Sequence, residues 1–319
     1  MRKIIIFLCI LFTIGSTKAE NVIGDYLRSF IYIYKKDYQK AYEELKKAVK
    51  KDPSSSFLHL KLGLVLFKLK KYAEAEKELK YAKKLDPDNL DISATLIFFY
   101  TARGEKEKLE EEYQFFLEKA HKLQPQNIKI SEYLAQFYFY KKMPREAIKI
   151  YQMIIKQKPD YADGYYWLGY LYDDTGERKK AIKMWKKTLE LNPKHADALN
   201  SLGYIYAEEG IKLNEAEKLV KKALEKDPQN GAYLDSLGWV YFKKKEYKKA
   251  EDFLLKAIKF TKDPAIYEHL GDLYITLNDK EKALKFYKEG LKFFPQSLSL
   301  KKKVEKYESK NKGIEKNSQ

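Results

Sequence analysis

Sulfur and arginine are scarce in this chain of 319 residues. The single cysteine, Cys9, excludes an intrachain disulfide and a zinc site built from cysteines. Only five of the 63 basic residues are arginines, the side chain best suited to bidentate contacts with phosphate. The net charge of +17 therefore indicates a solvated lysine-rich surface rather than a nucleic-acid site. Glycine and proline are also few, 14 and nine residues, which favours a nearly all-helical protein.

Motifs for catalysis and metal binding are lacking as well. The four histidines lie far from one another in the sequence, and no His-Glu-x-x-His or EF-hand pattern occurs. No phosphate-binding glycine loop and no Gly-x-Ser-x-Gly nucleophile motif is present. We therefore predict that the protein is not an enzyme and that it binds no cofactor and no metal.

The first residues have the layout of a secretory signal peptide. Arg2 and Lys3 precede an apolar stretch over residues 4–14, and small residues follow up to Ala19. Cleavage after Ala19 would remove Cys9, which is itself poorly placed for lipid attachment, and would lower the net charge to +14. We predict an exported, periplasmic or envelope-associated protein whose mature chain is soluble. It would contact a membrane only through partners or, alternatively, through an uncleaved leader.

Eight of the nine prolines recur at nearly equal intervals. They are Pro53, Pro87, Pro125, Pro159, Pro193, Pro228, Pro264 and Pro295. The intervals are 34, 38, 34, 34, 35, 36 and 31 residues, and a period near 34 is typical of repeated helix-turn-helix pairs.

Each interval contains two helical patterns of apolar and small residues. In residues 165–172 the residues Tyr165, Leu168, Gly169 and Tyr172 follow helical spacing, and Gly176 provides a turn. A second helix with Ala181, Trp185 and Thr188 on one face then ends before Pro193. A glycine inside a helix is costly unless another helix approaches closely, so we predict close helix contacts at a recurring set of glycines. This set is Gly63, Gly169, Gly203, Gly238 and Gly271.

This pattern resembles the tetratricopeptide repeat, with its Trp-x2-Leu-Gly-x2-Tyr…Ala-x3-Phe…Pro signature. The resemblance implies an all-α fold, a right-handed superhelical solenoid of about eight helix-turn-helix repeats closed by a C-terminal capping helix. The predicted segments are the signal peptide at 1–19, repeats one to three at 20–127, repeats four to eight at 128–296, the capping helix at 297–310 and a disordered tail at 311–319. The third repeat is irregular, with about four extra residues near 105–112.

In tetratricopeptide proteins the first helix of each repeat lines the groove that holds a partner peptide. The residues at the corresponding places in repeats four to eight are mostly aromatic or acidic, and Gln136 and Asn200 could bond a peptide backbone. This resemblance implies a groove built from Tyr133, Gln136, Tyr140, Asp163, Tyr166, Trp167, Tyr170, Asp174, Asp197, Asn200, Tyr204, Asp235, Trp239, Phe242, Glu268 and Asp272. In an alternative interpretation, Tyr170, Tyr204 and Trp239 pack between neighbouring first helices.

An acidic groove in a basic protein favours a basic peptide or helix of a protein partner and disfavours nucleic acid. The stretches 232–242 and 263–274 are similar to bacterial envelope tetratricopeptide proteins, many of them lipoproteins and some of them adaptors for a periplasmic protease. We therefore expect an envelope scaffold or adaptor. The alternative is an assembly component of a secretion, pilus or polysaccharide-export machine, which would dock through the apolar first two repeats.

Overall fold

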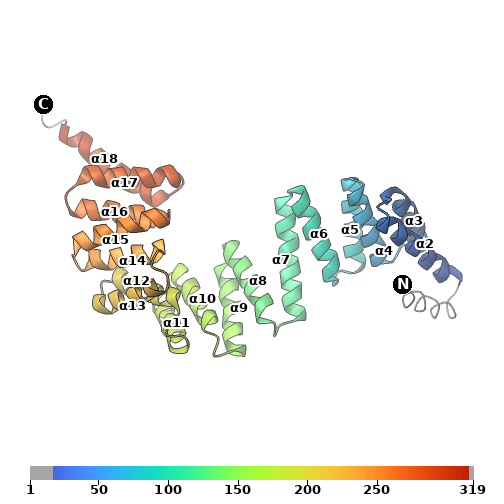
Figure 1. The fold of residues 1–319 in the computed structure, drawn as a ribbon, viewed down its shortest axis with the longest axis horizontal. Coiled ribbons are helices and arrows are strands. Elements are labelled where there is room, and N and C mark those ends of the chain that lie inside the picture. Colours follow the sequence, from blue (N-terminus) through green and yellow to red (C-terminus); the bar gives the residue numbers. More distant parts are fainter. Residues whose placement is uncertain (1–16, 316–319) are drawn as a thin grey trace. The chain divides into compact units, whose positions relative to one another are not determined.

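The structure is a computed structural model that describes the backbone of residues 17–315 and the side chains of residues 21–308. Residues 17–315 form 17 α-helices joined by short turns and contain no strand, which confirms the predicted all-α fold (Figure 1). The predicted signal peptide lies outside the described residues, except for its last three, which begin the first described helix. No helix within residues 17–315 combines the length and apolarity that crossing a membrane requires.

The chain divides into two compact units. Unit 1 ends at Lys141 and contains α2 (Thr17–Tyr34), α3 (Tyr38–Lys51), α4 (Ser56–Lys68), α5 (Tyr72–Leu85), α6 (Leu90–Arg103), α7 (Lys106–Leu123) and α8 (Ile128–Tyr140). Unit 2 begins at Lys142 and contains α9 (Pro144–Gln157), α10 (Ala162–Asp174), α11 (Arg178–Leu191), α12 (Ala196–Glu208), α13 (Leu213–Lys226), α14 (Gly231–Lys243), α15 (Tyr247–Phe260), α16 (Pro264–Thr276), α17 (Lys280–Phe293) and α18 (Leu298–Glu315). The division therefore falls after α8, whereas the predicted division at 127/128 falls before it.

Within each unit, consecutive helices pack as pairs, for example α4 with α5 and α14 with α15. Seven of the eight recurring prolines lie in the turns between pairs, because proline cannot continue the preceding helix, and the eighth, Pro264, is the first residue of α16. Polar caps then begin several first helices. The Asn230 side chain, for instance, accepts hydrogen bonds from the backbone N–H groups of Ala232 and Tyr233 at 3.1 and 3.2 Å.

The glycines inside first helices lie where the paired second helix approaches most closely, as predicted. A Cβ atom at Gly203 would lie 2.6 Å from Val220 Cγ2 and 3.0 Å from the Ala216 carbonyl oxygen. At Gly271 it would lie within the Tyr287 ring, 2.0 Å from Cε1. Any side chain at these two positions would therefore push the paired helices apart.

The turn inside a pair uses a left-handed backbone conformation. Gly176 has φ of 80°, which confirms the predicted glycine turn. Lys36, Lys70 and Lys245 occupy the same turn of other pairs with φ between 59° and 64°, where a side chain is unfavourable. The turn geometry is thus retained even where the sequence does not supply glycine.

The irregular third repeat is explained by the length of α7. This helix has 18 residues, whereas α3, α5, α9, α11, α13, α15 and α17 have 14 each. Four residues make about one helical turn, so the extra residues lengthen α7 instead of forming a loop.

The last helix covers the apolar face of α17. Leu300 is fully buried, Val304 is 9% exposed, and the Tyr307 ring stacks on Tyr287 with centroids 6.1 Å apart. These are the residues predicted for the capping face. The helix differs from the prediction in length, because it continues to Glu315, through residues predicted to be disordered. Residues 316–319 lie outside the described residues.

Candidate functional site

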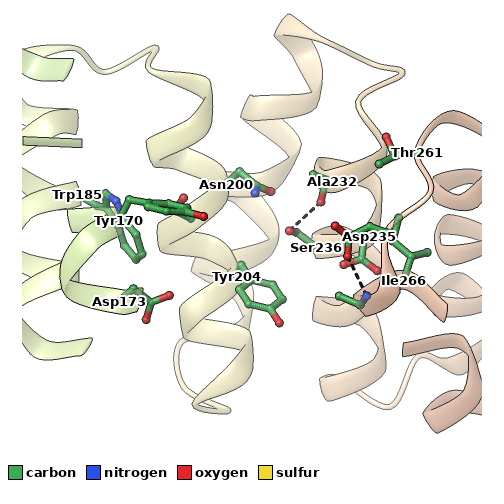
Figure 2. Close-up of a pocket in the computed structure, with 13 residues that line it drawn as sticks. Tyr170, Asp173, Trp185, Asn200, Tyr204, Ala232, Asp235, Ser236, Thr261 and Ile266 are labelled. Carbon is green, nitrogen blue, oxygen red and sulfur yellow. Dashed lines mark hydrogen bonds between the residues drawn. The ribbon is translucent and has the colours of Figure 1, made fainter. Parts of the chain in front are cut away.

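The predicted groove residues of unit 2 lie on four first helices, α10, α12, α14 and α16. We call the surface formed by these residues the first-helix face. It contains a pocket of about 400 Å³, shown in Figure 2. The pocket is lined by Tyr170, Asp173, Trp185, Asn200, Ser201, Tyr204, Ala232, Asp235, Ser236, Thr261, Asp263, Ala265 and Ile266. Four of the predicted residues, Tyr170, Asn200, Tyr204 and Asp235, therefore meet at one place.

The pocket is rich in negative charge. Its lining includes the carboxylates of Asp173, Asp235 and Asp263 and no lysine or arginine. Partial burial raises the pKa of Asp173, and the nearby carboxylates of Asp174 and Glu208 add to this effect, whereas Arg178 opposes it. A positively charged ligand would relieve this repulsion.

Two tyrosine rings also line the pocket. Tyr170 is 38% exposed, and Tyr204 is partly buried. Burial, aided by the charges of Glu208 and Asp235, raises the pKa of Tyr204, so its hydroxyl stays protonated near neutral pH. These two rings provide an apolar surface beside the carboxylates.

Trp239 lies in the helix packing rather than at an open surface. It is 7% exposed and stacks on His269 and Phe242, with centroids 4.0 and 4.6 Å apart. Its indole N–H donates a hydrogen bond to Glu208. At Trp239 the alternative interpretation, packing between neighbouring first helices, therefore describes the geometry better.

Glu268 and Asp272 are occupied by the capping helix. Ser299 Oγ donates a hydrogen bond to Glu268 at 2.7 Å. The Lys303 ammonium group donates to Asp272, whose carboxylate also accepts a hydrogen bond from the Tyr287 hydroxyl at 2.6 Å. These two predicted groove carboxylates thus contribute to the attachment of α18.

The predicted residues on α10 form a second aromatic cluster. Trp167 lies between Tyr151 and Tyr170, with centroids 6.5 and 5.7 Å away. Tyr166 lies against the His195 ring at 4.8 Å, and burial raises the pKa of Tyr166 to about 12. Of the predicted carboxylates, Asp163 lies 3.2 Å from His195 Nε2, Asp197 accepts a hydrogen bond from the Tyr233 hydroxyl, and Asp174 is exposed.

Tyr133, Gln136 and Tyr140 belong to unit 1 and line a different pocket. This pocket has a volume of about 570 Å³ and is mostly apolar. Its other lining residues are Ile97, Thr101, Leu109, Glu110, Tyr113 and Phe137. The predicted groove set therefore divides between the two units.

Several pocket residues were not predicted from the sequence. Asp263 is the N-cap of α16 and accepts a hydrogen bond from the Ala265 N–H at 2.8 Å. The Asp-Pro pair that begins this helix is a recognisable capping signal, which places the carboxylate at the pocket edge. Ala232 and Ser236 carry no such signal, because their role depends on the helix that faces them. Among the residues described, no cluster of three or more histidine, cysteine, aspartate or glutamate side chains could hold a metal ion.

Comparisons with known proteins agree with this architecture. Family profiles described as "Tetratricopeptide repeat" match residues 32–89, 169–231, 212–265 and 264–297. No curated protein matches the sequence.

Solved structures share the fold at low sequence identity. A thermophilic tetratricopeptide protein of Thermus thermophilus is 20% identical and covers 56% of this chain and 98% of its own, with a TM-score of 0.51. The Cut9–Hcn1 hetero-tetramer of APC/C is 16% identical and covers 85% of this chain and 52% of its own, with a TM-score of 0.56. Helix pairs with close contacts at glycine, turns at the recurring prolines and matching profiles over more than half of the length together show that the chain belongs to the tetratricopeptide repeat family.

Proposed function

We propose that the protein is a non-enzymatic scaffold or adaptor of the bacterial cell envelope that holds a peptide segment or helix of a protein partner on the first-helix face of unit 2. Tetratricopeptide repeats are in general protein-interaction modules, and no catalytic family is indicated. The observation that carries the proposal is the pocket of three carboxylates and two tyrosines in a chain of net charge +17. Such a pocket selects partners by charge and offers aromatic contact area.

The location in the envelope rests on the leader-like residues 1–19, and the role of an adaptor for a periplasmic protease rests on the resemblance of the C-terminal repeats. The N-terminus of the purified mature chain tests the first point. Cleavage of the leader would place Glu20 first, whereas an intact Met1 would contradict removal of the leader.

A second candidate function is suggested by α2. Its side chains Ile23, Phe30, Ile31 and Tyr34 are 52, 57, 50 and 84% exposed, an unusual density of apolar surface on one helix. Such a surface would suit a component of a secretion, pilus or polysaccharide-export assembly that docks through its first repeats.

Photo-crosslinking in cells separates the two functions. A photoreactive amino acid replaces Tyr170 in one version of the protein and Tyr34 in another, with Lys248 on α15 as the control position. We expect a discrete crosslinked protein from Tyr170 and none from Lys248. Crosslinks from Tyr34 alone would contradict the first proposal and favour the second.

A further inference from the structure

Neighbouring first helices of unit 2 meet through a repeated set of positions. The fifth residue of α12, α14 and α16 is a hydrogen-bond acceptor, namely Asn200, Asp235 and Glu268. The second and sixth residues of the next helix in this series are Ala232 and Ser236 on α14, Ala265 and His269 on α16, and Ser299 and Lys303 on α18. The same three helix positions therefore recur three times with different side chains.

At two of the three places the chain itself supplies the donor. His269 Nδ1 lies 2.9 and 3.1 Å from the two Asp235 oxygens. Ser299 donates to Glu268, and the Lys303 ammonium group donates to Asp272 while lying 4.0 Å from Glu268. In both cases a basic side chain at the sixth position contacts the acceptors of the preceding first helix.

At the third place, between α12 and α14, no such side chain is present. The side chain of Ala232 is apolar, and Ser236 Oγ donates to the Ala232 carbonyl oxygen of its own helix at 2.9 Å (Figure 2). Asn200 Oδ1 is buried and has no hydrogen-bond partner among the described residues. The pocket of about 400 Å³ lies at this place, lined by Asn200, Ala232 and Ser236.

We propose that this pocket takes the side chain of an arginine of the bound partner, which occupies the position that His269 and Lys303 hold at the next two places. The acceptors beside the pocket are Asn200 Oδ1, which has no partner among the described residues, and the carboxylates of Asp173 and Asp235, of which Asp235 already contacts His269. A guanidinium group has five N–H donors in a planar arrangement and also stacks on aromatic rings such as Tyr170 and Tyr204. This assignment rests on the proposed function, because it names the residue by which the partner is recognised.

Peptide selection on the intact chain tests the assignment and does not require the partner to be identified first. Random dodecapeptides displayed on phage are selected on the wild-type protein, and the selected peptides are synthesised with arginine or with its neutral isostere citrulline. We expect the selected peptides to share one arginine, and citrulline at that position to weaken binding by about tenfold or more. The overall charge of the protein cannot explain this result, because a net charge of +17 repels basic peptides.

Two substitutions at one position provide a matched comparison. Ser236→Lys introduces a basic side chain at the sixth position of α14, as Lys303 does on α18, and should weaken peptide binding by about tenfold or more. Ser236→Ala removes the hydroxyl group without filling the pocket and should retain the wild-type affinity. If Ser236→Lys does not fold, Asp173→Asn at the partly exposed edge of the pocket provides the test and should also weaken binding.

The outcomes separate this assignment from the proposed function. Selected peptides that lack a shared arginine, carry lysine in its place, or bind the folded Ser236→Lys variant with unchanged affinity would overturn the arginine assignment and leave a peptide-binding protein. Failure to select any peptide would overturn the assignment as well. Crosslinking from Tyr170 would then decide separately whether the first-helix face binds a partner.

Discussion

The imidazole ring of His269 lies between the Trp239 ring and the carboxylate of Asp235, and its side chain is almost fully buried. Burial lowers its pKa, but the charge and hydrogen bond of Asp235, with smaller effects of Glu208 and Asp272, leave the pKa raised above its ordinary value. The folded protein thus favours the protonated ring.

This raised pKa predicts a pH-dependent stability with a defined sign. The stabilisation is fully present below the unfolded pKa of about 6.5 and is lost as the pH rises through the higher pKa of the folded state. Urea unfolding of unit 2, followed by tryptophan fluorescence, measures the free energy of unfolding. Wild type should exceed His269→Gln in this free energy by more at pH 5.5 than at pH 9. The same difference in the free energy of unfolding at both pH values would contradict the raised pKa of His269.

His121 in unit 1 provides a control of opposite sign. Burial lowers the pKa of His121, so its stabilisation is present above the unfolded pKa and is lost as the pH falls below it. The free energy of unfolding of wild type should therefore exceed that of His121→Gln by less at pH 5.5 than at pH 8. Circular dichroism follows the unfolding of both proteins.

For single residues, part of the structure is predictable from the sequence and part is not. Glycines such as Gly203 and Gly271 indicate a close helix contact. Glycine inside a helix is destabilising, and close packing of a second helix compensates for this loss of stability. The stacking of Trp239 on His269 joins two repeats, so it depends on side-chain directions across an interface that no single repeat encodes. For the same reason the sequence alone does not identify Ser236 as a pocket residue.

Turns are the elements in which sequence and backbone disagree most clearly. The turn before α15 places Lys245 at φ of 64°, a conformation that costs a non-glycine residue roughly 1–2 kcal/mol. The repeat pattern overrides this local cost, because the turn aligns the glycine-containing face of α14 with α15.

Lys245→Gly should therefore stabilise the protein, by up to about 1 kcal/mol after the greater chain entropy of unfolded glycine is subtracted. The control, Lys256→Gly on the exposed side of α15, should destabilise by about 1 kcal/mol because it lies inside a helix. Thermal or urea unfolding measures both changes. A destabilised Lys245→Gly protein would show that the left-handed lysine is not strained.

The length of α7 is a second feature of the helices and turns that the sequence does not predict. The sequence shows extra residues in the third repeat, but a loop and an extended helix fit the same count. In the structure the residues of α7 continue the helix by about one turn. The charged run over 105–112 contains no glycine or proline that would end it.

The whole molecule combines a basic surface with an acidic pocket. Lysines dominate the composition, yet no lysine or arginine lines the pocket on the first-helix face. The period of the prolines made the repeat fold predictable, because the second helix of each repeat must end before a proline. The division of the chain after Lys141 lies between α8 and α9, inside the fourth predicted repeat, so the period of the prolines does not indicate it.

Peptide binding on the first-helix face of unit 2 is the central claim, and hydrogen–deuterium exchange of the intact protein tests it most directly. A peptide obtained by phage selection is added, and backbone protection is compared between first and second helices. We expect increased protection in α10, α12 and α14 and no change in α11, α13 and α15. Protection confined to the second helices or to unit 1 would contradict the claim.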